Sequence, residues 1–276
     1  MNGSALLSLK NVCFSYDDRP EALCDVSVSI YEGERIAVIG NNGAGKSTFF
    51  LCCNGVLVPQ KGGIYLHGQE VRPEKKSLNH LRRHVGIVFQ DANQQLIGAT
   101  TEEEISFGPM NMRLAPEEVG RRVEEVIEQM GLDALRQRPP HYLSGGEKKR
   151  LSIAGVLVML PELILLDEPT AFLDVRNTLL LENTLHDLHK QGKTLVVATH
   201  DIDFAGRWAT RVLMFMNGRL IADAPPHDIF NDKPLLEKVG IRQPVIYEFA
   251  QALLKKGLIS SLETSPATLD ELLKLL

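Results

Sequence analysis

The sequence of 276 residues predicts an α/β fold built on a mostly parallel sheet. Short apolar runs at Ile36–Ile39, Leu163–Leu166 and Thr194–Thr199 have the length and composition of strands buried on both faces. Helical patterns separate these runs along the chain, as expected of crossover connections. The segment from about 93 to 157 contains helical patterns but no strand pattern. We therefore expect a helical lobe inserted into the α/β core.

The N-terminal part begins with strands. Val26, Val28 and Ile30 alternate with polar residues, which indicates a half-buried strand before the buried run. A helix over Ser47–Leu57 and two further strands should follow, at Ile64–Leu66 and Val85–Phe89.

The C-terminal half carries clearer boundary signals. Pro116–Met130 shows one apolar stripe, with proline in the first turn and Glu117 and Glu118 at the positive end. A second helix begins near Ser144, and an Asn217-Gly218 turn predicts a hairpin. The remaining expected elements are the hairpin strands Val212–Met216 and Leu220–Ala222 and the helices Pro244–Lys256 and Thr268–Leu276.

Composition narrows the class of protein. Apolar residues make up 44% and charged residues 24%, and the net charge of −5 gives no basic excess for a nucleic-acid partner. Four cysteines without a CxxC pair indicate reduced thiols. We expect no signal peptide in the first residues and no spanning helix, since the longest apolar stretch, Ile153–Leu166, is interrupted by Pro161 and Glu162.

A phosphate-binding motif follows the first buried strand. The segment GNNGAGKST matches GxxxxGK[ST] between a strand and a helix. Its glycines let backbone N–H groups face phosphates, while Lys46 reaches the outer phosphates and Ser47 ligates Mg²⁺. A glycine-rich turn without a ligand is the alternative. The expected nucleotide-binding residues are Gly40, Asn41, Asn42, Gly43, Ala44, Gly45, Lys46, Ser47 and Thr48.

Two acidic residues end a later buried strand. Asp167 follows Leu163–Leu166 and should lie at the sheet edge where ligands bind, as a Mg²⁺ ligand. Glu168 is placed to polarise a water that attacks the γ-phosphate, whereas a solvated loop charge is the alternative. Because an NKxD-type guanine reader is absent from the sequence, ATP is expected instead of GTP.

The segment Leu143–Glu147, LSGGE, resembles the signature of ABC-type ATPases. Ser144 and Glu147 have the spacing of a capping box, and Gly145 and Gly146 leave the first N–H groups of the helix accessible to a phosphate. The resemblance implies a P-loop NTPase with a RecA-like mixed sheet, an inserted helical subdomain and an N-terminal antiparallel β subdomain. It also implies that each signature closes on the nucleotide of a second subunit.

Other family positions follow in the family's order. By resemblance, Gln90 is the glutamine that contacts Mg²⁺ or the attacking water, and His200 is the switch histidine that contacts the γ-phosphate. Asp174 resembles the aspartate at the dimer seam, and Tyr16 resembles the aromatic residue that stacks on adenine. Phe172 departs from the family pattern, in which small residues are common. Each of these residues could alternatively have a structural role.

The resemblance covers about residues 6 to 230. Three segments look most like the energy-coupling-factor group, and within it the ATPases of cobalt or nickel importers: VGIVFQDANQQLIGATTEEEISFGPMN, LSGGEKKRLSIAGVL and ATHDIDFAGRWATRVLMFMNGRLIADAPPHDIF. It predicts an ATPase domain over 1–240 and a C-terminal extension over 241–276, which either adds dimer contacts or packs on its own core. The segment around Gln94 and Gln95 should meet the membrane subunit, or else forms a polar loop. Expected partners are a second ATPase subunit, identical or paralogous, a transmembrane coupling subunit and a substrate-binding membrane subunit, which would place the chain peripherally on the cytoplasmic face of the cell membrane.

Three rival functions remain open at this point. They are an importer or exporter ATPase of another branch, a non-transport ABC ATPase acting on nucleic acid or ribosomes, and a module without turnover. The intact Glu168 and His200 argue against the last. Histidine pairs at His80/His84 and His186/His189 have helical spacing, but neither pair has a thiolate or carboxylate nearby on the same face in the sequence. We therefore expect no metal site there.

Overall fold

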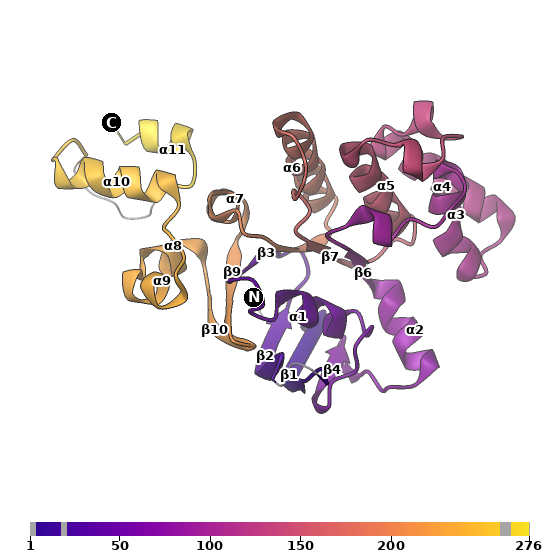
Figure 1. The fold of residues 1–276 in the computed structure, drawn as a ribbon, viewed down its shortest axis with the longest axis horizontal. Helices are drawn as coiled ribbons and strands as arrows, with labels where there is room; N and C mark the ends of the chain where they lie inside the picture. Colours follow the sequence, from indigo (N-terminus) through magenta and orange to yellow (C-terminus); the bar gives the residue numbers. More distant parts are fainter. Residues whose placement is uncertain (1–3, 18–20, 260–265, 276) are drawn as a thin grey trace.

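The computed structural model describes residues 4–17, 21–259 and 266–275. Its framework is two β-sheets, one mixed and central and one antiparallel, with helices around them (Figure 1). The predicted α/β class is confirmed. The ends of the two expected domains at 1–3 and 276, the segment 260–265 and the last residue of the predicted Thr268–Leu276 helix lie outside the described residues.

The central sheet has the strand order β10-β9-β3-β8-β7-β6. Strands β9, β3, β8, β7 and β6 run parallel, and β10 pairs with β9 as an antiparallel hairpin. All five residues of both β7 and β8 are buried, which explains their uninterrupted apolar sequences. The bounds are β3 Arg35–Ile39, β6 Val85–Val88, β7 Leu163–Asp167, β8 Thr194–Ala198, β9 Arg211–Met216 and β10 Arg219–Ala224.

The second sheet is antiparallel, with the order β2-β1-β4-β5. Its core-facing residues alternate with exposed ones, so one face packs on the domain core. Helices α1 (Lys46–Cys53) and α2 (Lys75–His84) lie beside it (Figure 1). The predicted helix over Ser47–Leu57 is wrong at its end, because Gly55 adopts φ 72° after the last turn. The strands are β1 Leu7–Phe14, β2 Leu23–Ile30, β4 Lys61–Leu66 and β5 Gln69–Glu70.

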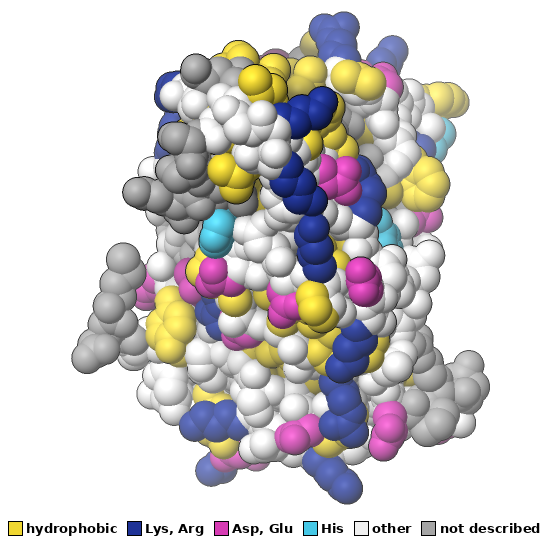
Figure 2. Space-filling view, turned by 90° about the vertical axis from the view of Figure 1, so that its left-hand side faces the viewer, with side chains coloured by type: hydrophobic (Ala, Val, Ile, Leu, Met, Phe, Trp, Pro, Cys, Tyr) yellow, Lys and Arg dark blue, Asp and Glu magenta, His cyan; other side chains and the backbone are white. Residues whose placement is uncertain are grey.

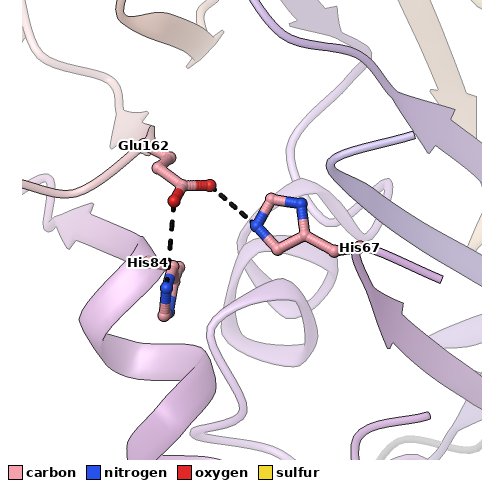
Figure 3. A group of neighbouring side chains, drawn as sticks. All are labelled: His67, His84 and Glu162. Carbon is pink, nitrogen blue, oxygen red and sulfur yellow. Dashed lines mark ion pairs between the residues drawn. The ribbon is translucent and has the colours of Figure 1, made fainter. Parts of the chain in front are cut away.

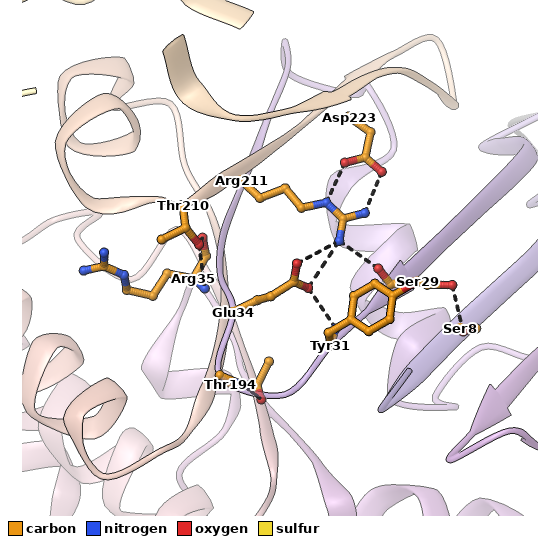
Figure 4. A network of polar contacts seen from close by, with 10 residues as sticks. Ser8, Ser29, Tyr31, Glu34, Arg35, Thr194, Thr210, Arg211 and Asp223 are labelled. Carbon is orange, nitrogen blue, oxygen red and sulfur yellow. Dashed lines mark hydrogen bonds and ion pairs between the residues drawn. The ribbon is translucent and has the colours of Figure 1, made fainter. Parts of the chain in front are cut away.

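A polar network joins the two sheets (Figure 4). The Arg211 guanidinium on β9 pairs with both carboxylate oxygens of Asp223 on β10 at 2.6 Å and with Glu34 Oε1 at 3.0 Å. It also donates to the carbonyl oxygen of Ser29 on β2 at 2.9 Å. These contacts raise the pKa of Arg211, chiefly through the hydrogen bonds to Asp223. The network therefore fixes the antiparallel sheet against the edge of the central sheet.

Between residues 93 and 157, the regular elements of the described chain are all helices. Figure 1 places this lobe to one side of the central sheet, next to β6. Its apolar residues, including Ile105, Ile127 and Ile153, form one cluster with buried residues of β6, β7 and β8. The helices are η1 Ala92–Gln94, α3 Thr101–Asn111, α4 Pro116–Met130, η2 Asp133–Leu135, η3 Pro140–Tyr142 and α5 Gly145–Leu157.

The C-terminal helices lie on the opposite side of the molecule (Figure 1). In α10, Tyr247 is buried and meets the Phe230 ring edge-on at 5.8 Å, whereas Val245 and Phe249 are exposed. None of the described helices is long and apolar enough to cross a membrane. The remaining helices are α6 Val175–Lys190, α7 Ile202–Trp208, α8 Pro226–Asn231, α9 Lys233–Val239, α10 Val245–Lys255 and α11 Leu269–Leu273.

Candidate functional site

The loop between β3 and α1 has the backbone that a phosphate cradle requires. Gly40 adopts φ 149° and Gly45 φ 110°, and a Cβ on either would meet a backbone oxygen, at 2.3 Å and 2.8 Å respectively. Gly45 is also the N-cap of α1 and provides no side-chain cap. The first N–H groups of α1 are therefore available to an anion.

The buried Lys46 side chain runs back across this loop. Its ammonium donates to the carbonyl oxygen of Gly40 at 2.7 Å and lies 3.3 Å from both Asn41 O and His200 Nε2. Burial lowers the pKa of Lys46, and the charges of Glu168 and Asp167 oppose that shift. The same ammonium is placed to pair with phosphate oxygens at the mouth of the loop.

Glu168 has a strained backbone and an unusual proton affinity. Its φ is +44°, a region that non-glycine residues rarely adopt and that clusters at functional sites. Burial raises the pKa of its carboxyl to about 7, opposed by a hydrogen bond from the His200 backbone and by the charge of Lys46. The parallel ladder places Glu168 here, because its N–H donates to Ala198 O on β8 at 2.9 Å.

His200 lies between the base candidate and the lysine. Its Nε2 is 3.2 Å from Glu168 Oε1 and 3.3 Å from Lys46 Nζ. Burial, and next the charge of Lys46, lower the pKa of His200, so the imidazole is neutral at pH 7. We assign its proton to Nδ1, because Nε2 must accept the lysine hydrogen bond.

These side chains face one cavity of about 210 Å³. It brings together residues from four parts of the chain, which the sequence motifs predict as one site. A volume below the roughly 300–1,000 Å³ of drug-sized ligand sites suits the phosphate end of a nucleotide. The lining residues are Asn42, Gly43, Ala44, Gly45, Lys46, Ser47, Thr48, Gln90, Asp167, Glu168 and His200.

Two further predicted residues adjoin this site without lining the cavity. Tyr16 packs edge-on against Phe14 at 5.0 Å and has its hydroxyl 3.4 Å from Thr48 Oγ1, so its ring lies at the start of α1. The Asn41 side chain instead donates to Val239 O at 2.6 Å, which ties the phosphate loop to α9.

The signature residues are not part of the cavity lining as the structure describes it. Ser144 caps α5 in a full capping box with Glu147, which is partly exposed. A Cβ on Gly145 would make only an ordinary van der Waals contact, with Phe172 O at 3.8 Å, whereas a Cβ on Gly146 would lie 2.2 Å from Asn177 Oδ1. Asp174 caps α6 by accepting from Asn177 N at 2.7 Å. The glycines thus have different roles: Gly146 admits Asn177, and Gly145 leaves the helix start uncovered.

Lys149 is a positioning residue that the sequence motifs do not reveal. It is buried, and its ammonium donates to Phe89 O at 3.0 Å and to Gln90 O at 2.8 Å. Burial lowers its pKa to about 8. Lys149 shares a helix face with the buried Gly146 and Ile153, and this periodicity is the signal that could have indicated its burial. It connects the signature helix to the segment carrying Gln90.

The donor set of the cavity fits Mg²⁺. Ser47 contributes a hydroxyl, Asp167 a carboxylate at the end of β7, and Gln90 an amide oxygen. Magnesium prefers such oxygen ligands, together with phosphate oxygens and water.

A phosphate loop on a central, mostly parallel sheet, with two carboxylates at the end of another strand of the same sheet, defines a P-loop nucleoside triphosphatase. The family model described as ABC transporter matches residues 23–171. An energy-coupling factor transporter ATP-binding protein, EcfA, of Methanocaldococcus jannaschii is 39% identical over 91% of this chain and 90% of its own length. The chain therefore belongs to the ABC transporter ATPases, as an ATP-binding subunit of the energy-coupling-factor type.

Another curated relative and two solved structures support the same family assignment. EcfA2 of Methanospirillum hungatei is 38% identical over 98% of this chain and 68% of its own length. The structure of cbiO1 from Clostridium perfringens, part of the ABC transporter complex cbiONQ, has a TM-score of 0.76 at 37% identity, covering 90% of this chain and all of that chain. A dimeric ATP-binding cassette, MJ0796, bound to ADP and Pi, has a TM-score of 0.72 at 31% identity, covering 80% and 98%.

Proposed function

We propose that this chain powers uptake through an energy-coupling-factor importer by hydrolysing ATP between two subunits, and that the transported solute is cobalt or nickel. The observation that carries the catalytic part is the convergence of Lys46, Asp167, Glu168 and His200 on one cavity. The choice of cobalt or nickel rests on the resemblance of the sequence to the ATPases of importers for these ions. Transport of a vitamin or another function of ABC ATPases is the alternative if the experiments below contradict this proposal.

The side chains suggest the following division of roles. Lys46 and the uncapped start of α1 hold the β- and γ-phosphates. The Glu168 carboxylate accepts a proton from water aligned with the γ-phosphate, and neutral His200 contacts the transferring phosphoryl group. When bound by Ser47, Asp167 and Gln90, Mg²⁺ would neutralise charge on the phosphate oxygens. Tyr16 would stack on the base.

Two features favour a composite site between subunits. The phosphate cavity is small, and the exposed Ser144 helix start does not contribute to it. Hydrophobic side chains beside Asp174 are exposed as well: Phe172 at 89%, Val175 at 79% and Leu179 at 56%. A second copy would cover this surface and bring its own signature to the nucleotide, as in a two-fold symmetric dimer. The exposed apolar side chains of α10 would extend the contact. Figure 2 views the molecule from the side of the C-terminal helices and shows hydrophobic side chains toward its upper end.

A subunit-mixing experiment tests the composite site. Lys46→Ala removes the phosphate-loop cation, and Gly145→Asp adds a negative charge at the signature, where a side chain has room. Each variant alone should lose ATPase activity. Randomly mixed dimers should recover about a quarter of the wild-type activity, because half of them contain one intact composite site. If mixing restores nothing while both variants remain folded, catalysis does not cross a subunit boundary.

A groove between the helical lobe and the core is the proposed docking site for the membrane subunit. Its volume is about 490 Å³, and it runs past Gln95 to α2 and α3. Ile97 and Phe107 line it and are 67% and 50% exposed, which suits an apolar helix face with a few polar contacts. Lys149 and Gln95 join this region to α5, since Gln95 accepts from Phe89 N and donates to Ser152 O. A helix seated there could sense nucleotide closure.

Co-purification of membrane subunits followed by uptake of cobalt and nickel tests the transport assignment. Ile97→Asp should abolish co-purification and uptake while leaving the basal ATPase activity of the isolated chain unchanged. Uptake of a vitamin and of neither ion would reject the proposed solute but keep the importer. ATPase stimulation by DNA or ribosomes, with no membrane partner, would reject the importer.

A further inference from the structure

His67, His84 and Glu162 form a cluster (Figure 3) that shares no residue with the lining of the nucleotide cavity. The three side chains come from the β4–β5 turn, the end of α2 and the residue before β7. One ligand atom of each lies within 4.8 Å of the others. The sequence-based expectation of no metal site near His84 missed this arrangement, because the carboxylate arrives from a distant part of the chain.

We propose that this cluster is a binding site for a divalent first-row metal ion, with Zn²⁺, Co²⁺ and Ni²⁺ as the matching class. Two imidazoles and one carboxylate are the ligands that these ions share. The proposal goes beyond the ATPase function and does not depend on it.

The distances fit a metal site after side-chain movements. Glu162 Oε2 lies 2.8 Å from His67 Nε2, and Glu162 Oε1 lies 3.8 Å from His84 Nε2. Ligands about 2.0–2.1 Å from a tetrahedral Zn²⁺ are separated by about 3.3 Å. One ligand atom from each residue lies within 4.8 Å of the other two, so the atoms would have to draw together by up to about 1.5 Å to surround one ion.

The protonation pattern favours a cation at the centre. His84 Nδ1 is 2.8 Å from the carbonyl oxygen of His80, so we assign its proton to Nδ1, which leaves a lone pair on Nε2. This backbone contact is the usual second partner of a metal-binding histidine. Glu162 Oε2 is buried, and His67 Nε2 lies 2.8 Å from it, so the same nitrogen of a neutral His67 and this oxygen are available to one cation. Lone pairs from His84 and Glu162 thus converge without a proton between them.

The backbone holds the three residues in place. Glu162 N donates to the carbonyl oxygen of His84 at 2.9 Å, and Glu162 O accepts from Thr194 N at 3.1 Å. His67 has φ +48° in a two-residue turn, where asparagine or glycine would be less strained. Lys193 is the cation near Glu162, but its ammonium donates to Pro161 O at 2.9 Å. The side chains of His67, His84 and Glu162 are 40%, 26% and 43% exposed, so an ion can reach them.

The position separates this site from the catalytic one. Glu162 precedes β7, and Asp167 ends that strand five residues later, about 16 Å away, with Glu168 directly after it. A bound ion would connect the antiparallel sheet, α2 and the base of β7. We expect it to stabilise the joint between the two sheets without entering the nucleotide cavity.

Titration of the nucleotide-free chain with Co²⁺ and Zn²⁺ tests the proposal. The wild-type chain should bind one Co²⁺ ion tightly and show the visible spectrum of tetrahedral Co²⁺. Added Zn²⁺ should displace the Co²⁺ and abolish that spectrum. His67→Ala and Glu162→Gln should each weaken binding at least tenfold and remove the spectrum. His186→Ala is the exposed-histidine control and should change neither the metal affinity nor the Co²⁺ spectrum. Asp167→Asn should still bind one metal ion tightly.

Thermal unfolding gives a second readout. Zn²⁺ should raise Tm of the wild-type chain and of Asp167→Asn, but not of Glu162→Gln. The inference is overturned if wild-type protein takes up no saturable equivalent, or if both cluster variants bind as tightly as wild type. It is equally overturned if Asp167→Asn alone removes the binding, because the ion would then occupy the Mg²⁺ site.

Discussion

The raised pKa of Glu168 makes a quantitative prediction about pH. With a pKa of about 7, the deprotonated fraction of Glu168 rises from about 0.1 at pH 6 to about 0.9 at pH 8. If this carboxylate is the base, kcat/KM for ATP should rise roughly tenfold over that interval, with a midpoint near pH 7. Steady-state ATPase assays at constant ionic strength measure the profile.

The raised pKa of Glu168 also makes the free energy of unfolding depend on pH. The folded chain binds the Glu168 proton more tightly than the unfolded chain, in which the carboxyl has its ordinary value of 4.5. Protonation therefore favours folding, and the free energy of unfolding should fall by about 3 kcal/mol as pH rises from below 4.5 to above 7. Glu168→Gln removes this cost. It should be more stable than wild type at pH 8 by up to that amount and equal to it near pH 4.5.

Urea denaturation at the two pH values measures the difference, with exposed Glu70→Gln as the matched control. Glu168→Gln should also bind ATP and remain dimeric with little turnover. The reasoning is refuted by a wild-type rate profile that is flat between pH 6 and 8. It is also refuted by equal stabilities of Glu168→Gln and wild type at pH 8, or by normal turnover of the variant.

Three more variants test a buried lysine, the network between the two sheets and the proposed dimer surface. Lys149→Met should lower the free energy of unfolding by about 1–3 kcal/mol in urea, because the carbonyl oxygens of Phe89 and Gln90 lose their donor, and unchanged stability would contradict this. Arg211→Lys should cost at least about 1 kcal/mol, because lysine cannot pair with both oxygens of Asp223 while donating to Ser29; an unaltered urea midpoint would speak against it. Phe172→Asp should leave stability within about 0.5 kcal/mol, since the side chain is 89% exposed and aspartate tolerates its φ of 63°, yet weaken ATP-dependent dimers at least tenfold by size-exclusion chromatography; undiminished dimers would remove Phe172 from the interface.

The sequence alone determined the parts of this protein whose signals are local. Strands such as Leu163–Asp167 are buried on both faces and read as continuous apolar runs. The phosphate loop requires glycine at positions where a Cβ would clash with the backbone, so its motif can be recognised from the sequence alone. The Ser144–Glu147 capping box and the Asn217-Gly218 turn are likewise set within a few residues.

Tertiary structure decided what depends on residues that are far apart in the sequence. Burial beneath the sheet edge raises the Glu168 pKa, and the carbonyl oxygens after β6 turn Lys149 from an apparent surface charge into a buried link. The approach of Glu162 to His67 and His84 required the base of β7, the end of α2 and a strained turn to meet. Proton affinity and ligand geometry vary with distances of a few ångströms, which sequence spacing does not encode across separate elements.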